Sequence, residues 1–278
     1  MASNNRIFYA CQLVGINRMG GGSGELTIAH GVQSIGITTN FNLEQAFELG
    51  QIQIYENIEG LPDVEVTMEK LMDGYPLLYH LASSGSTNNS LTSRSKSRTD
   101  VRLGIYPDDA DQVAGTPDVE VYCSGMYINS ISYTIPVDGN ATESLTFVGN
   151  NKKWLTGLAA TPTSDDAQKF LHGAHVVGSD EPLAYSYAYS GGVQRREDVI
   201  MASSILPVGI QGVRNVVKVG NGMDSDFVNN GVHIQNVSIS TDFSREDIME
   251  LGRKTPYFRA PGFPIEVSCE IEAITISG

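Results

Sequence analysis

The sequence predicts a mainly β protein built from antiparallel strands, and three observations support this fold class. Apolar residues recur at every second position along much of the chain, which is the spacing of a half-buried strand. Helical patterns are few and short. The composition, with 41% apolar and 18% charged residues, is that of a folded chain. At 278 residues the chain can form one large domain or two ordinary ones.

The clearest strand signal is a hairpin. Residues 130–137 alternate between polar and apolar side chains, Asp138-Gly139 supplies a turn, and the alternation resumes at 145–147. Shorter alternating runs at 63–69, 101–105 and 119–123 predict three further strands, each with one face toward solvent.

Two short helices and one mobile loop complete the expected elements. Pro76 suits the first position of a helix that continues through Leu77, Leu78 and Leu81. A second short helix is expected to open at Ser164 and to end near residue 173. Residues 83–99 have almost nothing apolar to bury, which indicates a mobile, solvated loop.

An internal repeat is the most informative feature of the sequence. Residues 31–71 align with residues 233–274, at a constant offset of 202 as far as Pro62 and with one residue dropped near Asp63. Each copy is expected to contain a strand, a capped turn, a stop at Gly50 or Gly252, and an extended return. Such self-similarity indicates a duplicated supersecondary unit. The identical positions are Gln33, Ile37, Thr39, Phe41, Glu44, Glu48, Leu49, Gly50, Tyr55, Gly60 and Pro62, with their counterparts 202 residues later.

The duplication makes a structural prediction of its own. Phe41 and Phe243 occupy matching positions, so we expect them to lie in equivalent places in the two copies.

The sequence does not carry the residue patterns of an enzyme. Gly20–Gly24 lacks the Gly-Lys-Ser/Thr ending of a phosphate-binding loop. His172 and His175 have no third ligand at metal-binding spacing. We therefore expect no catalytic residues, no cofactor and no metal. The three cysteines form neither a Cys-x-x-Cys pair nor a disulfide framework.

Charge is the strongest chemical signal. The chain has 32 acidic and 18 basic residues, a net charge of −14, which disfavours static binding of nucleic acid. Residues 31–71 contain seven acids and one base, and residues 233–274 contain seven acids and four bases. The acids that recur along the expected strands have two interpretations, a merely solvated face or the lining of a channel that repels phosphate. They are Glu65, Glu69, Glu266, Glu270 and Glu272.

Three segments together resemble the major tail tube protein of a long-tailed bacteriophage, of myovirus or siphovirus type. They are TNFNLEQAFELGQIQIYENIEGLPDVEVTMEKLMDGYPLLYHLA at 39–82, YINSISYTIPVDGNATESLTFVG at 127–149 and GGVQRREDVIMASSILPVGIQG at 191–212. The resemblance implies an antiparallel β-sandwich or half-barrel with a short flanking helix. Long hairpins of neighbouring chains would complete an inner β-barrel in a ring oligomer. Stacked rings would then form a hollow conduit with an acidic lumen for genome delivery.

The resemblance also implies an organisation and a set of site residues. It assigns an N-terminal arm to 1–30, a tube core to 31–149 and 191–278, and an outer insertion to 150–190. The five recurring acids would face the lumen. Six positions in the hairpin and the repeats would lie at contacts between subunits, namely Ile37, Phe41, Ile131, Tyr133, Ile239 and Phe243.

The expected partners follow from the same resemblance. They are further copies of the chain in homo-oligomeric stacked rings and other tail proteins: the tape measure, the baseplate, the terminator and, in a contractile tail, the sheath. DNA would pass only in transit. The resemblance also implies a virion tail protein assembled in the host cytoplasm. No apolar stretch reaches membrane-spanning length, so we expect no membrane span.

Alternatives remain open at this stage. The repeat fits either a six-subunit ring or a three-subunit pseudo-hexamer in which each copy marks a tube domain. A neck, terminator or decoration protein of the virion would also be acidic and rich in strands. A carbohydrate-binding β-sandwich would instead use Trp154, Tyr185, Tyr187 and Tyr189 to line a sugar cleft.

Overall fold

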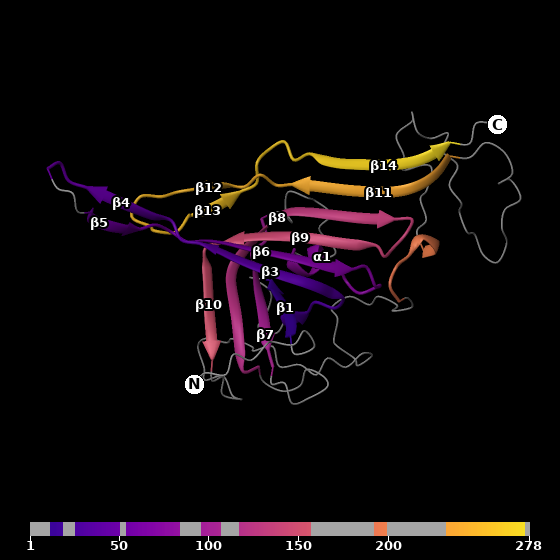
Figure 1. The fold of residues 1–278 in the computed structure, drawn as a ribbon, viewed down its shortest axis with the longest axis horizontal. Helices are drawn as coiled ribbons and strands as arrows, with labels where there is room; N and C mark the ends of the chain where they lie inside the picture. Colours follow the sequence, from indigo (N-terminus) through magenta and orange to yellow (C-terminus); the bar gives the residue numbers. More distant parts are fainter. Residues whose placement is uncertain are drawn as a thin grey trace, which may run out of the picture.

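The computed structural model describes residues 12–18, 26–50, 54–83, 96–106, 117–156, 192–198 and 232–275. Within these residues the chain is mainly antiparallel β, as the alternating pattern predicts, with one short α-helix (Figure 1). Ten strands form one continuous hydrogen-bonded network, and two further pairs form separate hairpins. The second expected helix, at 164–173, lies outside the described residues.

The strand network divides into two sheets that share one strand. A six-stranded sheet has the order β14-β11-β8-β9-β6-β3, and a five-stranded sheet contains β2, β1, β7, β8 and β10. The bounds in the first sheet are β3 (Val32–Asn40), β6 (Asp63–Leu71), β8 (Val119–Pro136), β9 (Thr142–Gly149), β11 (Val232–Asp242) and β14 (Val267–Thr275). The others are β1 (Gln12–Arg18), β2 (Leu26–Ile28), β7 (Thr99–Ile105) and β10 (Asn151–Thr156).

The shared strand β8 forms the corner between the sheets. Its first half pairs with β7 and β10, and its second half pairs with β9 and β11. The backbone of Gly125 has φ +67° at the change of direction, a conformation that favours glycine. The strands of the two sheets consequently run nearly perpendicular to each other in Figure 1. The runs at 119–123 and 130–137, predicted as separate strands, therefore lie in one strand of 18 residues, which ends at Pro136.

The hydrophobic core lies between the two sheets. β6 shows the simplest alternation, with Val64, Val66 and Met68 buried and Asp63, Glu65 and Glu69 exposed. Helix α1 (Leu78–Ala82) closes one side of the core with Leu78 and Ala82. This helix begins one position beyond Leu77, close to the start that Pro76 predicts. The core side chains contributed by the other strands include Ile16, Val101, Val121, Ile128, Ile131, Leu145 and Phe147.

Parts of two predicted segments are strands of the five-stranded sheet. β1 and β2 fall within residues 1–30, the expected N-terminal arm, and β10 falls within residues 150–190, the expected outer insertion. Residues 157–190 lie outside the described residues, as do 84–95 of the expected mobile loop. Ser83 and Thr99, at the two ends of that loop, are buried.

The duplicated units are visible as two similar strand pairs. β3 pairs with β6, and β11 pairs with β14, both antiparallel. In each copy a hairpin interrupts the connection between the paired strands, namely β4 (Leu43–Phe47) with β5 (Ile54–Glu59), and β12 (Glu246–Ile248) with β13 (Phe258–Ala260). The capped turns expected at 42–45 and 244–247 are wrong over most of their length, because β4 and β12 occupy 43–45 and 246–247. Ser244 is the exception, with a left-handed backbone at φ +42°. The Asn42 amide donates across to Leu61 O, 3.0 Å away, and so ties this segment to the return segment.

A buried carboxylate attaches helix α1 to the six-stranded sheet. Glu143 on β9 is fully buried and accepts hydrogen bonds from the backbone N–H groups of Leu78 (2.7 Å) and Tyr79 (3.1 Å). It also accepts the Tyr133 hydroxyl at 3.2 Å. These bonds satisfy donors that a helix start leaves without intrahelical partners. Burial nevertheless raises the pKa of Glu143, since the charged form is poorly solvated there.

Glu143→Ala is expected to lower the free energy of unfolding by about 2–4 kcal/mol, because it leaves buried N–H groups without an acceptor. Glu143→Gln should cost less, since its amide oxygen can accept one of these bonds. The raised pKa also gives a pH dependence. Stability from this group is present below its ordinary pKa of 4.5 and is lost as the pH rises through the folded-state pKa. Urea unfolding of wild type and Glu143→Gln from pH 4 upward measures this; a constant difference would contradict it.

Candidate functional site

The outward face of the six-stranded sheet is a continuous polar surface. Beyond the β-bulges, cross-strand register places on this face the even-numbered residues within 34–40 of β3, 130–136 of β8, 142–148 of β9, 236–242 of β11 and 268–272 of β14, together with the odd-numbered residues of β6. Hydroxyl, amide and carboxylate groups dominate it, and its described strand positions include neither Lys nor Arg. We call it the polar face. Its members include Ser34, Thr38, Asn40, Glu65, Thr67, Glu69, Ser130, Ser132, Thr134, Thr142, Ser144, Thr146, Asn236, Ser238, Ser240, Ser268, Glu270 and Glu272.

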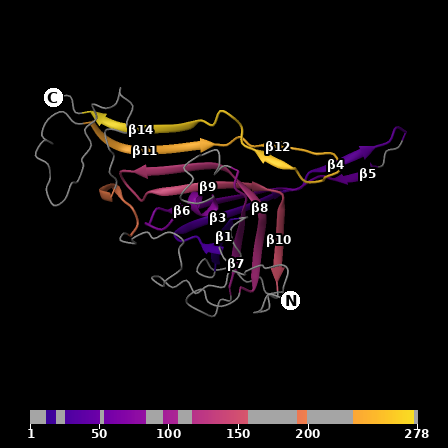
Figure 2. The same cartoon turned by 180° about the vertical axis from the view of Figure 1, so that it is seen from behind.

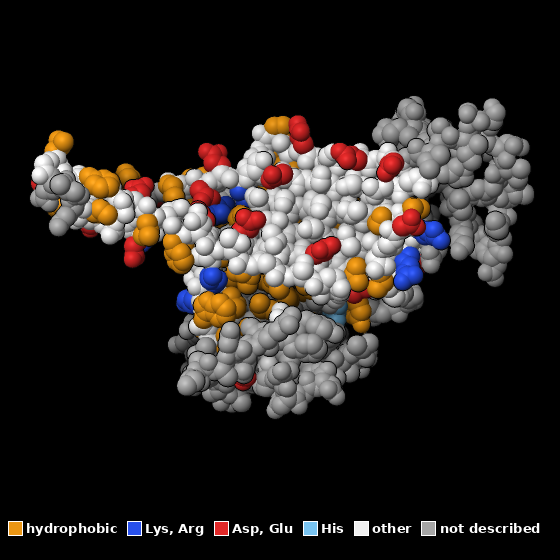
Figure 3. Space-filling model, viewed as in Figure 1, with side chains coloured by type: hydrophobic (Ala, Val, Ile, Leu, Met, Phe, Trp, Pro, Cys, Tyr) orange, Lys and Arg blue, Asp and Glu red, His pale blue; other side chains and the backbone are white. Residues whose placement is uncertain are grey.

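The acids singled out in the sequence gather on this surface. Glu65 and Glu69 lie on β6, and Glu270 and Glu272 lie on β14, all exposed on the polar face. Glu266 is exposed just before β14 begins. In Figure 3 acidic side chains are spread over a surface that otherwise consists of small polar side chains and backbone. The two repeat copies thus contribute their acids to one face of one sheet.

The polar face ends in two open edges. β3 and β14 each pair with a single described strand, so each has one edge with no described partner. Neither nine-residue strand contains the Pro, Lys or Arg residues that commonly protect an edge from pairing. Every neighbouring pair across the six strands is antiparallel, so β3 and β14 run in opposite directions. A second copy placed beside the first can therefore continue the sheet with the same alternation of direction.

Two hairpins project beyond one end of the six-stranded sheet. Both views of the fold show β4–β5 and β12–β13 at the end opposite to the β8–β9 turn (Figures 1 and 2). We call residues 42–61 the first arm and residues 244–263 the second arm. Gly50 (φ +93°) and Gly252 (φ +87°) provide left-handed turns at matching positions in the two arms.

The two arms expose similar apolar side chains. Leu49 and Leu251, beside the turn glycines, are completely exposed. Tyr55 and Tyr257 are about equally exposed, at 68% and 65%. Phe47 on the first arm has Met249 as its exposed counterpart on the second. So many large apolar side chains, exposed outside the core at one end of the six-stranded sheet, indicate a contact surface for another molecule.

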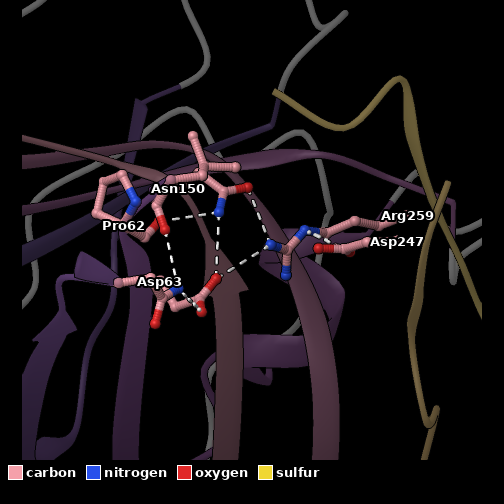
Figure 4. Close-up of polar contacts among 7 residues, drawn as sticks. Pro62, Asp63, Asn150, Asp247 and Arg259 are labelled. Carbon is pink, nitrogen blue, oxygen red and sulfur yellow. Dashed lines mark hydrogen bonds and ion pairs between the residues drawn. The ribbon is translucent and has the colours of Figure 1, made fainter. Parts of the chain in front are cut away.

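A polar junction holds the bases of the two arms together (Figure 4). Arg259 of the second arm pairs with Asp247 at 3.1 Å and donates to Asn150 Oδ1 at 2.9 Å. The Asn150 amide in turn donates to Pro62 O at 2.9 Å, next to the first arm. Arg259 also approaches Asp63, with N and O 4.0 Å apart. Because Arg259 is only 8% exposed, this network fixes the position of one arm base relative to the other.

The six positions expected at subunit contacts fall into different environments. Ile131 and Phe243 are buried in the core, and Ile37 and Tyr133 pack partly against it. Ile239 is half-buried, whereas Phe41 is 69% exposed. Phe41 and Phe243 thus follow equivalent strands, as expected, but their surroundings differ. The reason is the sheet order: β11 has β8 on its second side, while β3 is at the edge.

The described residues contain no group of three or more His, Cys, Asp or Glu side chains arranged to hold a metal ion. No helix among them has the length and apolar character needed to cross a membrane. Of the aromatic residues that the sugar-binding alternative needs, Trp154 is 60% exposed on β10, and the three tyrosines lie outside the described residues.

Comparison with known proteins gives structural matches only. Neither a family model nor a curated protein sequence matches the chain. One similar structure is a chain of the anti-feeding prophage cap, the AFP tube terminating cap, with TM-score 0.40, 13% identity and coverage of 56% of this chain and 95% of that one. A second comes from the sheath-tube complex of the extracellular contractile injection system PVC, with TM-score 0.35, 10% identity and coverage of 55% and 94%. A third comes from a native gene transfer agent particle, with TM-score 0.33, 9% identity and coverage of 54% and 100%.

Proposed function

We propose that the protein is a structural component of a phage-like tail. Copies of the protein would form rings, and the rings would stack into a hollow tube. The observation that carries this proposal is the polar face with its two open, oppositely directed edges. Pairing of β3 with β14 of the next chain would satisfy backbone groups at both edges and generate a closed ring. The polar face would then line the bore.

The chemistry of the polar face supports a conduit for DNA. A lining of hydroxyls and carboxylates without basic residues repels phosphate, so a passing duplex has no site at which to bind. The predicted lumen-facing acids are therefore Glu65, Glu69, Glu266, Glu270 and Glu272, and DNA is a transient passenger rather than a ligand. The protein would act as part of the particle, together with other tail proteins, and not as an enzyme.

The arms support stacking of rings into a tube. They project along the strand direction, past the end of the sheet, and the edges proposed to close the ring lie along its sides. A ring would carry two arms per chain on one end, and the next ring would cover their apolar side chains. This feature favours a tube over the single ring of a neck or terminator protein.

Negative-stain electron microscopy of the purified chain tests the proposal. We expect hollow rods without added metal, and views down the axis should show six chains per ring, because both repeat copies belong to one sheet. Three chains per ring would mean that each copy acts as a separate tube domain. Isolated rings would favour a terminator or neck protein. A stable monomer at high concentration in sedimentation experiments would contradict ring formation altogether.

A further inference from the structure

We propose that the contact between β11 and β8 inside one chain is the template for the contact between β3 and β14 of neighbouring chains. The inference rests on the proposed ring and identifies how one copy recognises the next. Across the six-stranded sheet the second copy appears as β14-β11 and the first as β6-β3, with corresponding strands running in the same direction. The copies are thus related by a shift along the sheet, with β8 and β9 between them.

This arrangement makes β8 and a neighbour's β14 equivalent. β8 covers the side of β11 that faces away from β14, and it runs antiparallel to β11. The corresponding side of β3 is the edge that has no partner among the described strands. A neighbour's β14 placed there would have the same direction as β8 and would continue the sheet. The position that β8 fills within the chain is thereby filled by a second copy.

Phe243 shows what such a contact does to the base of an arm. Its N–H donates to Asn129 O at 2.8 Å, which extends the β11–β8 ladder past the end of β11. Its ring is fully buried, and the Arg245 guanidinium lies 5.6 Å from the ring centre. Arg245 is held by its bond to Ile128 O on β8, at 2.6 Å. The burial of Phe243 therefore depends on β8.

The first copy has the same backbone position without this cover. Phe41 matches Phe243 and is 69% exposed, and Leu43 matches Arg245 and is 63% exposed. At the other edge, exposed apolar groups lie at and just before β14, with Val267 at 58% and Phe263 at 63%. Ring closure would bring these two apolar rims together, so that Phe41 becomes buried as Phe243 already is.

The polar face restricts the register of this contact. Ser268 and Glu270 must lie on the same face as Ser34 and Thr38 if the lining is to continue across the boundary. The opposite face then brings Cys269, an exposed free cysteine on β14, beside odd-numbered residues of the neighbour's β3. Directly opposed residues on antiparallel strands have Cα atoms about 4.5–5.5 Å apart, which is within disulfide range.

A cysteine series along β3 tests this prediction. In a Cys11→Ser background, single cysteines are placed at residues 34 to 41 and the assembled protein is oxidised. We expect disulfide-linked multimers, from dimers up to the size of the ring, only from the odd-numbered group, Ile35, Ile37, Thr39 and Phe41, and their loss when Cys269→Ser is added. Rings that form without cross-links, or with cross-links from even-numbered positions, would overturn this contact but leave the proposed tube intact. A chain that forms no rings would reject the proposed function itself.

A second variant does not depend on register. Phe41→Asp should leave the monomer folded, because the side chain is exposed there, and should raise the concentration needed for ring closure roughly ten- to a hundredfold. Trp154→Asp, at 60% exposure on β10, is the matched control and should leave ring closure unchanged. Sedimentation velocity measures both. Equal behaviour of the two variants in ring closure would overturn the proposed role of Phe41.

Discussion

Leu49→Asp combined with Leu251→Asp is expected to abolish the stacking of rings while leaving ring closure intact. Both leucines are fully exposed beside the turn glycines of the arms, so neither contributes to the core of the lone chain. Burial of one leucine side chain contributes about 1.5–3 kcal/mol, and an aspartate in its place adds the cost of removing a charge from water. Every chain contributes two such side chains to the boundary between rings, so the lost binding free energy adds up over all chains of the ring.

Electron microscopy of the double variant should show single rings under conditions in which the wild type forms rods. Each single variant should have an intermediate effect if the arms are equivalent, as their similar exposed side chains indicate. Leu49→Met with Leu251→Met is the conservative control and should still form rods. Rods of normal length from the aspartate double variant would remove the arms from the stacking contact.

The sequence predicts the individual strands well because alternation depends on local burial. Val64, Val66 and Met68 alternate with polar residues, three of them acidic, and their burial follows directly from that pattern. The Asp138-Gly139 turn likewise predicts the β8–β9 hairpin, since two strands joined by a short turn pair with each other. The alternation of apolar residues and the turn residues are therefore sufficient to predict these strands.

The order of the strands in the sheet depends on pairing between distant segments, which a local pattern does not reveal. The expectations that the structure corrects depend on such pairing. The sequence matches Phe41 with Phe243, but only the neighbour of the preceding strand decides whether the side chain is buried. The sequence also contains no local signal that residues 119–136 form one strand across a corner. The arms show a third limit. The Asn and Ser residues that suggest a helix cap also suit the start of a hairpin, and the pairing of β4 with β5 and of β12 with β13 selects the hairpin.

The sequence predicts the acids of the polar face better than it predicts the order of the strands. The even spacing of Glu270 and Glu272, and the spacing by four of Glu65 and Glu69, place each pair on one face of its strand. The sequence alone does not show that both pairs lie on the same face of the sheet, because this depends on the pairing register across β11, β8 and β9. The arm junction of Arg259 with Asn150 was missed, because its partners are 109 residues apart and only the fold brings them together.

Reversing the charge of the polar face is expected to make the tube bind DNA. Glu65→Lys combined with Glu69→Lys changes the charge of this face by four units in every chain, and the copies repeat around the ring. Both side chains are exposed, so folding and assembly should persist. If the face lines the bore, the wild-type tube should not retain duplex DNA, whereas the variant should bind it at least about tenfold more tightly, with affinity that falls steeply as salt rises.

Retention of short duplex DNA by purified rods, measured over a range of salt concentrations, provides the readout. Asp118→Lys, at an exposed position just before the part of β8 that belongs to the five-stranded sheet, is the matched control for the single variant Glu65→Lys, which makes the same change of charge on the polar face. Because a channel concentrates the field of its lining, lysines inside it should hold DNA more strongly than lysines outside. Equal retention by the two variants would mean that the polar face lies on the exterior of the assembly, and the acids would then serve solubility only.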